Sequence, residues 1–222
     1  MGLTIHYSLH AAACPPAQAR QLVEQLHRRA LDLPFAEVGD IVEFEGDDCD
    51  FHRRDEGDPD RWLLVQSMRL TDTELVPPSH IIAFSTWPAD GCEQANFGLA
   101  MYPAAEPGWR WASFCKTQYA SNPDYDGINN FLRAHFTVVR LLDHAQELGI
   151  LKAVKDESGF WEKRDAKELV ETVGRWNEMM AGLVGQYKDL LGDEAIAEIT
   201  NYPDFEHLEA KGRDHNRPRP SE

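Results

Sequence analysis

Basic residues are scarce in this sequence. Its 222 residues contain 22 lysines and arginines against 38 aspartates and glutamates, which gives a formal net charge of −16. Proteins that bind along a nucleic-acid backbone or an anionic lipid surface need a basic face. We therefore expect neither a nucleic acid nor a membrane as a partner.

Long hydrophobic runs and paired cysteines are also lacking. No apolar window approaches the roughly 18 residues of a membrane-spanning helix. Residues 1–17 contain no lysine or arginine, and polar residues interrupt their apolar run, so they do not resemble a secretory signal. The four cysteines, Cys14, Cys49, Cys92 and Cys115, are widely spaced without a Cys-x-x-Cys motif. A soluble cytoplasmic protein with reduced thiols is predicted.

Familiar catalytic and cofactor motifs are missing as well. The chain has no Gly-x-Ser-x-Gly elbow, no glycine-rich phosphate loop and no His-Glu-x-x-His. His6 and His10 are the obvious pair of metal ligands, but residues four apart on a strand lie about 13 Å from each other, too far to share one ion. The sequence therefore predicts no metal site and no cofactor.

The hydrophobic residues of the chain recur at two spacings, every second residue as in strands and every three to four residues as in helices. Period-two alternation predicts a strand over 3–10, and helical spacing predicts a helix over 17–33. Further strands are predicted over 37–45, 62–70, 80–87, 95–102, 109–119, 151–155 and 160–163, and further helices over 126–148, from 165 onward and over 193–200. We expect an α+β fold, with an antiparallel sheet of about five to seven strands and two long helices plus one N-terminal helix packed on one face.

The expected organisation is a single domain over residues 1–210, followed by a flexible C-terminal tail over 211–222 that is rich in charge and proline. Three glycines, Gly174, Gly182 and Gly185, interrupt the apolar stripe of the last long helix and weaken it. They predict a bend or a close contact with another helix near Gly182.

Charge is densest in residues 37–60, which hold eleven acids against Arg53 and Arg54, a net charge of −9. A calcium loop is excluded because Phe51 and His52 stand at its fifth and sixth positions, counted from Asp47. A solvated acidic loop is the simplest interpretation of the segment. Docking of a basic protein partner is the functional alternative, and a divalent metal is the least favoured.

Three polar residues are the candidate ligand-binding residues. Lys116 and Gln118 follow the aromatic part of the strand over 109–119, and His135 stands in the centre of the apolar stripe of the helix over 126–148. The simpler alternatives are an ordinary strand end and a buried structural histidine.

Counting residues along this strand and helix predicts that His135 is buried and contacts at least one residue between 113 and 118. One possible set of neighbours lies on each face of the strand. The favoured set is Phe114, Lys116 and Gln118, and the alternative is Ser113, Cys115 and Thr117.

These observations favour a binding or interaction module for a protein partner or a small ligand. The alternative is an acid/base enzyme with its site between the helix over 126–148 and the end of the strand over 109–119. Whether the chain is an enzyme, what it binds and its oligomeric state are not determined by the sequence.

Overall fold

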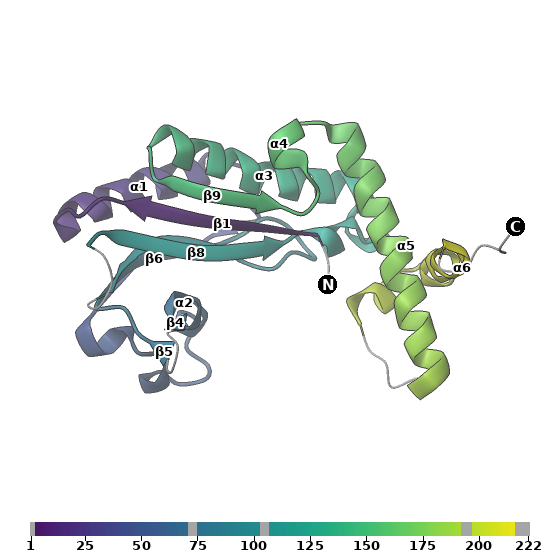
Figure 1. Ribbon diagram of the computed structural model, residues 1–222, viewed down its shortest axis with the longest axis horizontal. Helices are drawn as coiled ribbons and strands as arrows, with labels where there is room; N and C mark the ends of the chain where they lie inside the picture. Colours follow the sequence, from purple (N-terminus) through teal and green to yellow (C-terminus); the bar gives the residue numbers. More distant parts are fainter. Residues whose placement is uncertain (1–2, 71–74, 103–106, 192–196, 216–222) are drawn as a thin grey trace, which may run out of the picture.

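The computed structural model describes residues 3–70, 75–102, 107–191 and 197–215 (Figure 1). Its sheet contains β1 (Thr4–Ala11), β2 (Glu37–Val38), β3 (Val42–Glu45), β6 (His80–Trp87), β7 (Ala95–Met101), β8 (Trp109–Lys116) and β9 (Leu151–Asp156). The order is β2-β6-β7-β8-β1-β9, with β3 also paired to β6, and all neighbours are antiparallel. The predicted α+β class is confirmed.

Helices lie on both faces of this sheet and at one of its ends. The described helices are α1 (Pro16–Leu31), α2 (Arg61–Ser67), α3 (Gly127–Glu147), α4 (Phe160–Lys163), α5 (Ala166–Leu191) and α6 (Phe205–His215), and a separate small sheet pairs β4 (Arg69–Leu70) with β5 (Leu75–Val76). None of the helices in the described ranges is long and apolar enough to cross a membrane.

The inner face of the sheet forms the main hydrophobic core. Along β1 the buried side chains Ile5, Tyr7 and Leu9 alternate with more exposed ones, as the sequence pattern predicts. Ile5 pairs with Asp156 of β9, which is bonded to His135 of α3, so this face points toward α3. The apolar stripes of α1 and α3 cover it (Figure 1).

The outer face of the sheet is only half covered. The side chains of Asn96 and Ala100 lie on the same face of β7. Ala100 pairs with Arg110 of β8, and Arg110 pairs with His10 of β1, so this is the outer face of the sheet. The side chain of Asn96 donates a hydrogen bond to Gln66 of α2, so α2 lies on this outer face. Together with β4 and β5, α2 packs below the sheet in Figure 1 and leaves much of the outer face of β8, β1 and β9 uncovered.

The sheet opens along the seam between β7 and β8. Among the described residues, their ladder consists of two pairs, Ala100 with Arg110 and Met101 with Trp109. Further along the seam, the carbonyl oxygen of Asn96 accepts hydrogen bonds from two side chains. The Tyr7 hydroxyl donates over 2.8 Å and the Trp111 indole nitrogen over 2.9 Å. Side chains therefore replace backbone pairing in this part of the sheet.

Two predicted strands are helices in the structure. Residues 62–67 of the predicted strand over 62–70 belong to α2, because burial of Leu63, Leu64 and Ser67 follows the helical period. Short apolar runs fit either period, which explains the error. The predicted strand over 160–163 is α4, which begins after Gly159 adopts a left-handed conformation with a φ of 75°.

The long helix α5 crosses the end of the sheet instead of lying on its face, and it packs mainly against α3, α4 and α6 (Figure 1). A Cβ atom added to Gly182 would lie 2.7 Å from the backbone of Gly212 in α6. This contact confirms the close helix approach predicted near Gly182 and allows a second small core between α5 and α6.

The C-terminal predictions are only partly covered by the described residues. Of the helix predicted over 193–200, residues 193–196 lie outside them, and a 3₁₀ turn follows at Glu198–Asn201. The predicted flexible tail over 211–222 is wrong for 211–215, because α6 continues through these residues against α5. Residues 216–222 lie outside the described ranges, and the single domain over 1–210 stays a prediction.

Candidate functional site

His135 occupies the buried position that its place in the sequence predicts. Its side chain is 1% exposed, with Nδ1 3.1 Å from Thr117 Oγ1 and Nε2 3.1 Å from Asp156 Oδ2. The predicted contact with residues 113–118 is confirmed. The choice between the two possible sets of neighbours was wrong, because the bond comes from Thr117 and Phe114 is directed to the outer face, where it is 37% exposed.

The structure does not assemble Lys116, Gln118 and His135 into one site. The Gln118 side chain accepts a hydrogen bond from the backbone of Leu3 and donates one to Asn177, both over 3.0 Å. The Lys116 ammonium group lies 4.6 Å from the centre of the Tyr119 ring. Each of these side chains therefore has partners of its own.

Thr117, His135 and Asp156 form a hydroxyl–imidazole–carboxylate chain, an order that nucleophilic enzymes also use. Here the side chains of His135 and Asp156 are 1% and 0% exposed, and Thr117 is fully buried, so a substrate cannot reach them. Asp156 also accepts hydrogen bonds from the backbone of Ser158 and Trp161. We assign this chain to the packing of α3 against β9.

The electrostatics of Asp156 fit a structural role. Burial by itself raises the pKa of a carboxyl group. The hydrogen bond and charge of His135, together with the bonds from Ser158, outweigh that effect and hold the pKa of Asp156 below its ordinary value. The carboxylate is therefore ionised at neutral pH and stays bonded to its neighbours.

A cavity of about 440 Å³ lies at the step where the covered half of the outer face meets the open half. Gln66, Met68 and Arg69 approach it from α2 and β4, and Tyr102 follows β7. The floor and the opposite wall come from β1, β8 and β9, with Ser8, Leu9, His10, Arg110, Trp111, Ala112 and Lys152. The Tyr102 hydroxyl donates to the carbonyl oxygen of Ser67 over 2.7 Å, which ties the end of β7 to α2.

The charge of this cavity is opposite to that of the chain as a whole. Arg69, Arg110 and Lys152 line it, and none of its described lining residues is an aspartate or a glutamate. Burial raises the pKa of Tyr102 to about 12, against the opposing effect of the two arginines, so this phenol is neutral at physiological pH. The cavity thus combines three cations with a largely apolar lining.

A second hollow of about 380 Å³ continues from the first along the strands. Ser8 and Ala112 line both hollows, and Ala153 lines the second. The register places Ser8 directly opposite Ala112 on one side and Ala153 on the other. Small side chains therefore stand between the two hollows. At the far end, His6, Phe114 and Lys155 line the second hollow.

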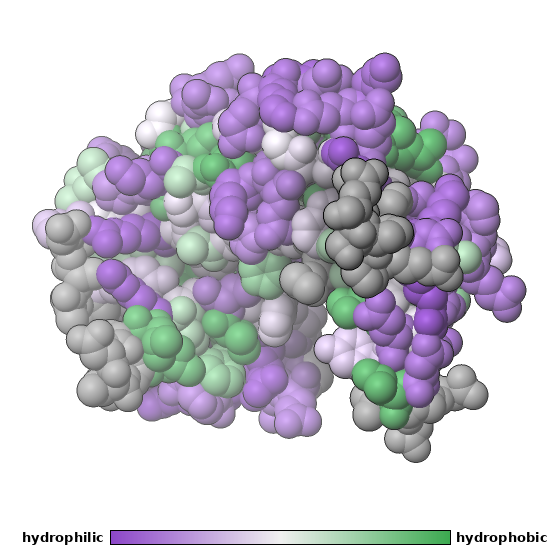
Figure 2. All heavy atoms as spheres, turned by 45° about the vertical axis from the view of Figure 1, so that its right-hand side comes forward, coloured by the Kyte–Doolittle hydropathy of each residue, from purple (hydrophilic) through white to green (hydrophobic). Residues whose placement is uncertain are grey.

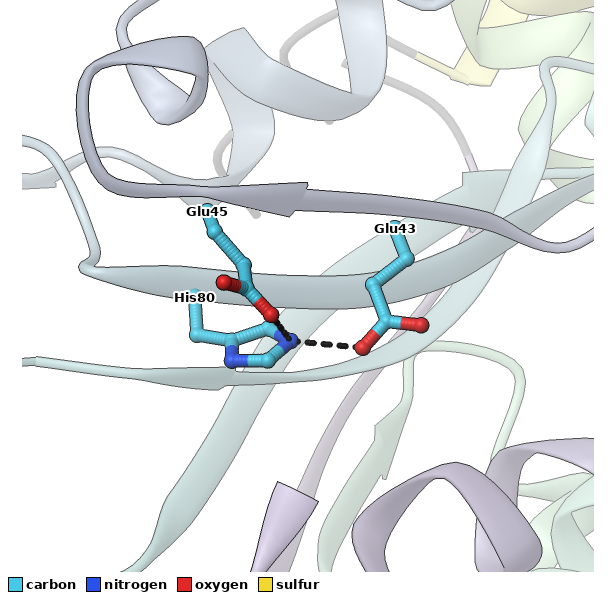
Figure 3. Close-up of side chains that lie close together, drawn as sticks. All are labelled: Glu43, Glu45 and His80. Atoms are coloured by element: carbon cyan, nitrogen blue, oxygen red, sulfur yellow. Dashed lines mark hydrogen bonds and ion pairs between the residues drawn. The ribbon is translucent and has the colours of Figure 1, made fainter. Parts of the chain in front are cut away.

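A different cluster has the residue types of a metal site. Glu43 and Glu45 of β3 both point to the imidazole of His80 on β6, with Nε2 2.7 Å and 3.6 Å from their carboxylate oxygens (Figure 3). Arg20 is bonded to the other oxygen of Glu43, and the edge of His80 packs against Trp109. Since Arg20 and His80 already satisfy Glu43, the cluster forms a complete ion-pair network without a metal.

The four cysteines give no sign of redox or nucleophilic chemistry. All four are free thiols, and Cys49 and Cys115 are fully buried. Burial raises the pKa of Cys115, which keeps this thiol protonated at neutral pH.

Hydrophilic side chains cover most of the described surface on the face seen in Figure 2.

Comparison with known proteins adds no functional information. No family model matches this sequence, and no curated protein or solved structure is similar to it.

Sequence reasoning missed the residues of this cavity. Its three cations come from β4, β8 and β9, and only the tertiary structure brings them together. One signal was available, since antiparallel pairing of the first strand with the strand over 109–119 places His10 opposite Arg110. The Glu43–Glu45–His80 cluster was missed because it depends on the register between β3 and β6.

Proposed function

We propose that this protein binds a small organic anion in the cavity at the step of the outer sheet face. One observation carries the proposal: Arg69, Arg110 and Lys152 line this cavity without an aspartate or glutamate among its described residues, in a chain of net charge −16. Cations gathered in one cavity of an acidic protein are well suited to attract a negatively charged group.

Local charges outweigh the overall charge in such a cavity. Two unit charges 4 Å apart near a protein surface interact by about 4 kcal/mol. Exposed charges farther away than about 8 Å are largely screened at physiological ionic strength. An anion inside the cavity therefore interacts mainly with the three cations that line it.

The apolar part of the lining favours an organic anion over an inorganic one. Met68 and Ala112 contribute apolar side chains to the lining, and Tyr102 contributes an aromatic ring. Apolar surface removed from water contributes roughly 25 cal/mol per Å². Because Tyr102 is held neutral and donates to Ser67, it supports binding and not proton transfer.

Anion binding can be tested with the fluorescent probe 8-anilinonaphthalene-1-sulfonate, an aromatic sulfonate. We expect saturable binding by the wild type, weakened about thirtyfold in a variant that combines Arg69→Gln and Lys152→Gln. Each lost charge-assisted contact contributes on the order of 1 kcal/mol. The matched control is Lys167→Gln, which removes an 87% exposed cation from α5.

The control variant should bind the sulfonate as the wild type does. Equal affinities of the double variant and the control would contradict the proposal, as would the absence of binding by the wild type. Circular dichroism checks that both variants are folded.

Two further expectations remain proposals. A basic protein partner for the acidic segment 37–60 is supported by its exposed carboxylates, of which Asp47 is 79% exposed. A cytoplasmic location is supported by the four free thiols, since disulfides are rare in reducing compartments. Absence of nucleic-acid binding also stays a prediction from the net charge.

A further inference from the structure

The geometry of the two joined hollows points to a specific class of ligand. We infer that the anion carries an unbranched carbon chain, with its charged head at Arg69, Arg110 and Lys152 and its chain extending along the strands toward Phe114. This inference rests on the proposed function, because the head group occupies the cavity proposed above.

The direction of the chain follows from the register. His10 and Arg110 pair at the level of the first hollow, and His6 and Phe114 pair at the level of the second. Four residues along a strand span about 13 Å. The two hollows therefore form an elongated trough parallel to β1, whose length suits an extended chain better than a compact ring.

The row of small side chains makes this trough continuous. Ser8, Ala112 and Ala153 stand side by side on three neighbouring strands between the two hollows. A large side chain at any of these positions would close the passage. Ala112 and Ala153 are exposed, so the passage is open to a ligand from the solvent side.

The two ends of the trough differ in chemistry. Three cations gather at the first end, where the carboxylate or sulfonate group would bind. At the second end the aromatic ring of Phe114 is 37% exposed. His6 and Lys155 complete that end at its rim, and the Nε2 atom of His6 lies 3.7 Å from a carboxylate oxygen of Glu157. A charged head with an apolar chain matches this order.

A series of carboxylates of increasing chain length tests the inference. Hexanoate, octanoate and dodecanoate are titrated into the wild-type protein below their aggregation concentrations, and binding is measured by calorimetry. Each buried methylene strengthens binding, so dodecanoate should bind at least tenfold more tightly than hexanoate.

The variant Ala112→Phe tests whether the carbon chain of the ligand occupies the trough. Because Ala112 lines both hollows, the readout is the ratio of the two affinities, and we expect the preference of this variant for dodecanoate over hexanoate to disappear. Ala36→Phe is the matched control, since Ala36 is exposed and donates its backbone N–H to Trp87 at the opposite edge of the sheet. This control should bind all three carboxylates as the wild type does.

The outcomes distinguish the two proposals. Equal affinity for all chain lengths, with the sulfonate probe still bound, would overturn the carbon chain and leave the anion site in place. An Ala112→Phe variant that binds dodecanoate as tightly as Ala36→Phe does would also overturn it. If the wild type bound neither the carboxylates nor the sulfonate, the anion site itself would be overturned.

Discussion

His135 and His80 each face carboxylates, yet their surroundings differ. His135 and Asp156 are both fully enclosed between α3 and β9, and each also bonds to other buried groups. His80 is equally enclosed, but of its carboxylate partners Glu45 is 72% exposed. The same pair of chemical groups thus serves as a rigid core element in one place and as part of a surface network in the other. The comparison shows that access to solvent, more than hydrogen-bond geometry, decides what such a pair can do.

The largest expected effect is the loss of the buried pair. His135→Ala would leave the carboxylate of Asp156 without its imidazole partner in a region closed to water. Breaking a buried ion pair on one side costs about 3 kcal/mol or more. We expect a decrease of that size in the free energy of unfolding, measured by urea titration at pH 7. A decrease below about 1 kcal/mol would show that water reaches Asp156.

The pH dependence of stability sharpens the comparison further. The pKa of Asp156 is lower in the folded protein than its ordinary value. Its ionised form therefore stabilises the fold above the unfolded pKa of about 3.9, and this contribution disappears as the pH falls through the folded pKa. The wild type should be more stable than Asp156→Asn at pH 5 to 7, and the difference should shrink below about pH 4. A difference that stays constant down to pH 3 would contradict this assignment.

The smallest effect is expected at the exposed carboxylate. Glu45→Gln removes an ion pair whose atoms are 3.6 Å apart and whose carboxylate is largely in solvent. Exposed pairs typically contribute less than about 1 kcal/mol, and often nothing measurable. Urea unfolding of this variant should match the wild type within about 0.5 kcal/mol. A loss as large as that of His135→Ala would remove the distinction between the two histidines.

The sequence predicted His135 better than it predicted the cavity. The contact of His135 with the end of β8 follows from counting residues along a strand, a turn and a returning helix, so it needs only local geometry. Arg69 could not be placed in this way, because the segment before it was predicted to be a strand and is α2. Lys152 belongs to the cavity only because β9 pairs with β1 as an edge strand.

The seam between β7 and β8 has a consequence for how this fold tolerates change. A backbone ladder bond survives almost any substitution, because every residue except proline carries the same N–H and carbonyl groups. The bonds to the carbonyl oxygen of Asn96 instead depend on the Tyr7 hydroxyl and the Trp111 indole, each of which a single codon change can remove. At this seam the continuity of the sheet therefore depends on the identity of two side chains, so a single substitution can weaken it, whereas ordinary strand pairing tolerates most substitutions.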